Sequence, residues 1–146
     1  ATAGGTTSTA GYFNAFMLCS VGNSTNRDAS GMGEGWQVQY FQTTNVNPQA
    51  DEDRDGLNNL AEYIAGTNPR NGESWPGLSI DVSGTNRHLN FPLVTQRVYA
   101  VDYRTNLFSP WVPLITNIVG TRGDYVVPLG ESGPVRFYRY RVRLAP

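Results

Sequence analysis

Residues 136–144 read RFYRYRVRL, and their strict alternation decides the class of fold. Every second residue is apolar or aromatic: Tyr138, Tyr140, Val142 and Leu144. The residues between them are Arg139, Arg141 and Arg143. Because side chains alternate between the two faces of a strand, this pattern predicts a strand with one face in a core and the other in water. We interpret the arginine row as a solvated face or a subunit contact rather than a nucleic-acid patch.

Shorter runs with the same alternation come before this stretch. They cover residues 78–82, 89–93, 98–104, 111–115 and 124–127. Turn residues such as the SGTN of 83–86 separate them. About six short strands punctuated by turns are typical of a sandwich. We therefore predict a mainly-β protein with a small immunoglobulin-like β-sandwich over residues 75–146.

Residues 36–74 carry the helical signals. A short helix is expected near residues 36–41, and a second one is indicated by apolar residues at i, i+3, i+4 and i+7: Leu57, Leu60, Ala61 and Ile64. Gly66 is placed to end that helix in a left-handed conformation, and Pro69 prevents it from continuing.

Between these helices, residues 51–62 read DEDRDGLNNLAE and match the twelve-residue calcium loop. A tight loop directs alternate carboxylates to one centre, while glycine takes the sharp turn and the final glutamate closes the shell. The predicted ligands are Asp51, Asp53, Asp55, the Leu57 carbonyl, Asn59 and Glu62. Oxygen donors favour Ca²⁺ over zinc or copper, and the ligand count favours it over magnesium. The alternative is a solvated acidic turn that caps a helix at Leu57.

These stretches resemble the calcium modules near the C-termini of secreted bacterial proteins, which are related to dockerin and thrombospondin type 3 loops. The resemblance rests on residues 36–41, 47–48, 51–62 and 62–69, and continues in the β region at residues 99–107, 111–114 and 133–139. It covers roughly residues 31–144 and implies a calcium loop followed by a small β-sandwich. The chain departs from the pattern of this family at residues 33–35 and at Asn68. These two departures weaken the case for a second calcium site.

The N-terminal segment, residues 1–35, encloses an apolar run at 11–21 that is expected to be a strand. Its apolar face consists of Phe13, Ala15, Met17, Cys19 and Val21. A sandwich leaves an edge open, and this strand is suited to fill it, either in its own chain or in a neighbouring one. Repeated donation from copy to copy would make a filament, as in the extracellular filaments that the chain resembles. Residues 23–25 form a glycosylation sequon by pattern.

Composition narrows the classes of function. The net charge is -1 and all 11 basic residues are arginine, which argues against a nucleic-acid partner and excludes lysine chemistry. No apolar run is long enough for a membrane span, and the absence of an initial Met or a signal peptide leads us to expect a processed chain. One histidine, His88, and one cysteine leave no nameable catalytic set, so no enzymatic activity is expected.

We therefore predict a secreted calcium-binding structural protein, a homo-oligomeric subunit of an extracellular filament or surface assembly. Extracellular calcium modules bind with dissociation constants on the order of 0.1–1 mM, which suits an extracellular or cell-surface location. The alternative is a carbohydrate-binding or anchoring module from a larger secreted enzyme, in which Trp36, Trp75 and Trp111 would form a platform for sugars.

Overall fold

The computed structural model describes residues 19–20, 27–130 and 135–146. The helices are α1 (Glu34–Phe41) and α2 (Asn59–Ala65), and neither has the length or apolar character needed to span a bilayer. The strands are β1 (Cys19–Ser20), β2 (Ser79–Ser83), β3 (Asn86–Leu93), β4 (Arg97–Arg104), β5 (Val112–Val119), β6 (Gly123–Gly130) and β7 (Phe137–Leu144). The predicted assembly residues Phe13, Ala15, Met17 and Val21, and the sequon asparagine Asn23, lie outside the described residues; for Cys19 only the backbone is described.

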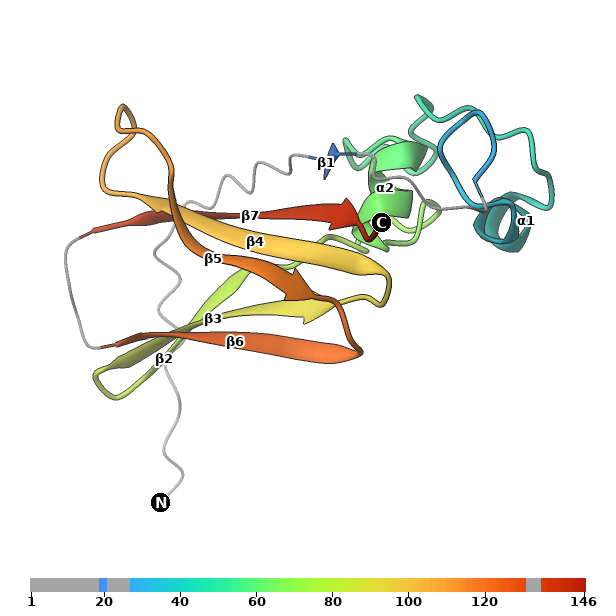
Figure 1. Ribbon diagram of the computed structural model, residues 1–146. Helices are drawn as coiled ribbons and strands as arrows, with labels where there is room; N and C mark the ends of the chain where they lie inside the picture. Colours follow the sequence, from blue (N-terminus) through green and yellow to red (C-terminus); the bar gives the residue numbers. More distant parts are fainter. Residues whose placement is uncertain (1–18, 21–26, 131–134) are drawn as a thin grey trace, which may run out of the picture.

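Two sheets lie face to face in a small sandwich (Figure 1). One sheet is the antiparallel set β2–β3–β6. The other has the order β1–β7–β4–β5, in which β4 is antiparallel to both of its neighbours and β1 is parallel to β7. The predicted mainly-β fold is confirmed, and the observed strands β2–β7 match the six predicted runs to within a few residues, except that β5 and β6 extend further toward the C-terminus.

The core lies between the sheets and follows the predicted alternation of β7. Tyr138, Tyr140, Val142 and Leu144 are all buried, and the arginines between them are not. The ring of Tyr140 stacks on that of Phe91 from β3, with centroids 5.6 Å apart and an interplanar angle of 14°. Burying a large apolar side chain contributes about 1.5–3 kcal/mol, so this face of β7 is a principal source of stability.

The helices lie beyond one end of the sandwich, where β7 ends (Figure 1). Gly66 ends α2 with φ 81°, as predicted, and an added Cβ there would be only 2.9 Å from Val94 Cγ2. The buried Arg97 at the start of β4 donates hydrogen bonds to the carbonyls of Ile64 (2.7 Å) and Tyr63 (2.5 Å). A cation at the C-terminus of a helix is favoured by the helix dipole, so this arginine joins α2 firmly to the sandwich.

The buried side of α2 differs in part from the predicted apolar stripe. Ile64 is buried as expected, but Leu57 lies before the helix and Leu60 is only half-buried. Asn59 and Glu62, two polar residues, are fully buried instead. The spacing of apolar residues does not predict the burial of polar residues such as these, because their burial comes from the loop that folds against them.

Candidate metal centre

The acidic loop is closed by backbone amides that donate to Asp51. The Arg54 amide donates to Asp51 Oδ1 (2.7 Å), and the Gly56 amide donates to Asp51 Oδ2 (3.0 Å). Gly56 has φ 97°, a conformation that residues with a Cβ rarely adopt, so glycine is needed at this turn. The turn places carboxylate oxygens of Asp51, Asp53 and Asp55 within 4.8 Å of one another, an arrangement that can hold a metal ion.

Asp53 and Asp55 each use one carboxylate oxygen to organise the loop. Asp53 Oδ1 accepts from the Asp55 amide (3.3 Å), and Asp55 Oδ1 accepts from the Leu57 amide (2.7 Å). The second oxygen of each, Oδ2, is buried and has no hydrogen-bond partner among the described residues. Buried carboxylate oxygens without partners are costly, because they lose the hydrogen bonds that water would supply.

The first turn of α2 brings two more oxygens of the same kind. Asn59 donates its side-chain amide to the Asn47 carbonyl (2.9 Å), which leaves its buried Oδ1 without a partner in the described part of the chain. Glu62 Oε1 accepts from the Thr67 hydroxyl (3.3 Å), while the buried Oε2 is likewise unpartnered. Four of the predicted ligands therefore each have one unpartnered buried oxygen, and all four atoms are hard donors suited to a hard cation.

The electrostatics of the loop are also those of an arrangement that can hold a cation. Burial raises the pKa of Glu62 to about 7, and the neighbouring charges of Asp53 and Asp55 add to the shift. Burial also raises the pKa of Asp55, against the Leu57 amide, which lowers it. Burial and the neighbouring aspartates thus disfavour the charged forms of Asp55 and Glu62, and a bound cation would oppose this effect.

The alternative interpretation, an acidic turn that caps the helix, is wrong about the capping residue. Helix α2 begins at Asn59, and its N-cap is Asn58, whose side chain accepts a hydrogen bond from the Ala61 amide (2.9 Å). No aspartate of the loop is therefore needed for capping. The carbonyl of Leu57 stays a predicted ligand.

Two supporting residues escaped the sequence interpretation. Thr67 positions Glu62 through its hydroxyl, and its backbone amide donates to the Glu62 carbonyl (3.1 Å). Gly72 lies against the loop, where an added Cβ would be 3.5 Å from the Asp53 carbonyl oxygen. Neither residue belongs to the twelve-residue pattern. The only feature of the sequence that could have indicated their supporting role is their position in the turn region after α2.

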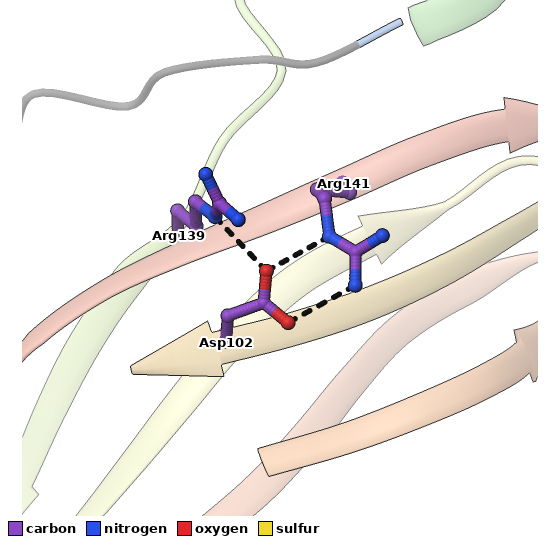
Figure 2. A network of polar contacts seen from close by, with 3 residues as sticks. All are labelled: Asp102, Arg139 and Arg141. Carbon is purple, nitrogen blue, oxygen red and sulfur yellow. Dashed lines mark hydrogen bonds and ion pairs between the residues drawn. The ribbon is translucent and has the colours of Figure 1, made fainter. Parts of the chain in front are cut away.

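A second carboxylate centre, also missed from the sequence, lies on the outer face of the four-stranded sheet. Asp102 of β4 is buried and faces two arginines of β7 (Figure 2). Arg141 binds it with two hydrogen bonds, from Nε (2.8 Å) and Nη2 (3.0 Å), and Arg139 Nε adds a third (2.9 Å). Burial alone would raise the pKa of Asp102, but the bonds from Arg141 and Arg139 outweigh it and hold the pKa below its ordinary value. The sequence interpretation of this face, as a solvated face or a subunit contact, did not include this ion-pair network within the chain.

The tryptophans considered for the carbohydrate alternative contact different neighbours. Trp36 packs against Tyr63 of α2, with ring centroids 5.4 Å apart. Trp111 lies beneath two guanidinium groups, those of Arg104 (4.4 Å from the ring centroid) and Arg139 (4.5 Å). Of the three tryptophans, only Trp75 is mostly exposed.

Comparisons with protein-family models, with curated proteins and with solved structures find no match for this chain. The case for a metal centre therefore rests on the geometry of the loop.

Proposed function

We propose that this chain is a calcium-binding structural protein of the extracellular space, and that it serves as a subunit of a filament or surface assembly. The observation that carries the metal part is the set of four buried oxygens on Asp53, Asp55, Asn59 and Glu62 that have no hydrogen-bond partner among the described residues. Two of these residues are 0 % exposed, so their oxygens have no access to water that would satisfy them.

Calcium is the cation that best suits this donor set. Every candidate ligand atom is an oxygen, which disfavours zinc and copper, and the number of oxygens exceeds what Mg²⁺ ordinarily takes from protein. The role is structural, because the loop is joined to the sandwich through α2 and Arg97. Ordering the loop then orders the end of the sandwich.

The assembly part is supported by the edge of the four-stranded sheet. Strand β1 comes from the N-terminal segment and lies beside β7, remote in sequence. A short edge strand attached through a Gly- and Asn-containing stretch is the kind of element that copies of a chain exchange. Repeated exchange with the next copy gives an open filament.

Electron microscopy of the purified protein in about 5 mM calcium, above the dissociation constants of extracellular modules, tests this function. We expect filaments with calcium, fewer with a chelator, and none after deletion of residues 1–30. Dispersed monomers under all three conditions would contradict the proposal. Retention of such monomers by a polysaccharide matrix would favour the carbohydrate-binding alternative.

A further inference from the structure

The outer face of the four-stranded sheet carries more positive charge than its own carboxylate compensates. Strands β4 and β7 place four arginines there, Arg104, Arg139, Arg141 and Arg143, whereas β5 has no charged residue. Asp102 is the only acidic residue of these three strands, and it pairs with Arg139 and Arg141 (Figure 2). Within the described part of the chain, Arg143 therefore has no carboxylate partner.

A hollow of about 390 Å³ lies beside this ion-pair network. Its lining comes from three neighbouring strands: Val98 and Ala100 of β4, Arg141 and Arg143 of β7, and Thr116 and Asn117 of β5. Ala100 pairs with Arg141, and its small side chain leaves space between the residues of β7 and β5. Sites for small molecules commonly have volumes of about 300–1,000 Å³, so the hollow has the size of a ligand site.

A β-bulge shapes the β5 side of the hollow. The pairing of β4 with β5 shifts by one residue between Tyr99 and Val101, so Thr116 and Asn117 together stand opposite the single residue Ala100. Asn117 has φ 58°, in the left-handed region that residues with a Cβ seldom adopt. Bulges and such backbone conformations are frequent beside functional sites, where they redirect side chains. Here the bulge brings two exposed polar residues in succession to one hollow.

The arginines of the hollow keep hydrogen-bond donors in reserve. Asp102 accepts from Nε and Nη2 of Arg141, and Arg141 Nη1 has no partner among the described residues. Arg143 donates only from Nη1 to the Leu144 carbonyl, at a long 3.4 Å. A guanidinium group has five N–H donors in a planar fork that suits carboxylate and phosphate oxygens. Asp102 also holds Arg141 in place, which reduces the entropy that a ligand must overcome.

We propose that this hollow binds an acidic sugar, with its carboxylate against Arg141 and Arg143 and its hydroxyls against Thr116 and Asn117. A carboxylate suits the site better than a phosphate dianion does, because Arg143 is the one arginine of the hollow without an ion pair among the described residues. The hydroxyl and amide side chains of β5 suit the hydroxyls of a sugar ring. The inference goes beyond the proposed function and depends neither on the calcium loop nor on assembly.

Isothermal titration calorimetry of the whole chain with glucuronate tests the ligand class. Low ionic strength limits screening of the arginines, and calcium is left out because it binds carboxylates itself. We expect saturable binding of glucuronate and none of glucose, which has the same ring without the carboxylate. Binding of glucose 6-phosphate or N-acetylglutamate as tight as that of glucuronate would overturn the assignment to an acidic sugar. Absence of glucuronate binding would overturn the site.

Two substitutions test the place of binding. Arg143→Gln removes the uncompensated charge, and Ala100→Ile fills the hollow with a β-branched side chain that suits a strand. Each should weaken glucuronate binding about tenfold or more, with melting curves to show that both variants fold. The control is Arg122→Gln, at an exposed arginine that does not line the hollow, and it should bind as the wild type does. Wild-type affinity in both folded test variants would overturn the site, whereas a failure to form filaments would contradict only the proposed function.

Discussion

The two carboxylate centres of this protein differ in what compensates the charge of their buried carboxylates. At the outer face of the sheet, Asp102 is buried but receives three hydrogen bonds from two arginines, all supplied by the chain. In the loop at 51–62, four carboxylates come together, and the buried second oxygens of Asp53, Asp55 and Glu62 lack partners in the described structure. The first centre has its counter-charges within the chain, whereas the second is an arrangement that can hold a cation.

The pKa values express this difference. The pKa of Asp102 is lowered, since the arginine bonds outweigh burial, and the pKa of Glu62 is raised to about 7, mainly by burial. The arginine-bound centre therefore stabilises the fold at neutral pH by itself, whereas under the proposed function the loop gains stability at neutral pH when a cation binds. Substitutions that affect one centre should leave the other's response unchanged.

The largest effect is expected from Asp102→Asn. It leaves Arg139 and Arg141 without their counter-charge on a partly buried face, which should lower the free energy of unfolding by about 3 kcal/mol. Urea denaturation with and without calcium measures this loss, and the calcium response itself should persist. Asp124→Asn, at an exposed carboxylate, is the control and should change the stability little. An equally small change for Asp102→Asn would contradict the structural role of the centre.

A smaller effect is expected from pH in the absence of calcium. Because the pKa of Glu62 rises from 4.5 to about 7 on folding, the folded state holds its proton more tightly than the unfolded state does. This contribution is fully present below pH 4.5 and is lost as the pH rises through 7. The Glu62→Gln variant should show a flatter stability profile between pH 5 and 8 in chelator. An unchanged profile would show that another group titrates.

The smallest effect is expected from Gly56→Ala. The added methyl has no neighbour within 4 Å, so the cost is the backbone strain at φ 97°, about 1–2 kcal/mol. Gly35→Ala is the matched control, because its Cβ also meets nothing, but it lies in α1, where alanine is favoured. Thermal melting should separate the two: a lower melting temperature for Gly56→Ala and an equal or higher one for Gly35→Ala. Equal shifts would contradict the need for glycine at the turn.

The sequence predicted the structure correctly at positions where the type of residue has one usual structural role. The alternation at 138–144 predicted a strand and its buried face, and Gly66 predicted the end of α2. The pattern at 51–62 predicted six ligands, and four of them have a buried oxygen without a partner among the described residues, while their role as ligands stays a prediction. Asp102 and Thr67 could not be found in this way, because their partners are brought close only by strand pairing or by the turn after α2. The burial of Asn59 was missed for the same reason.

The central claim, that the loop at 51–62 binds calcium and thereby stabilises the fold, is tested most directly by thermal melting with 10 mM calcium and with chelator. With a dissociation constant on the order of 0.1–1 mM, calcium should add about 1.4–2.7 kcal/mol, or on the order of 5 °C in melting temperature. Asp53→Ala should abolish the shift, whereas Glu52→Gln, at an exposed position between two predicted ligands, should retain most of it. Equal melting temperatures for the wild-type protein in calcium and in chelator would contradict the account.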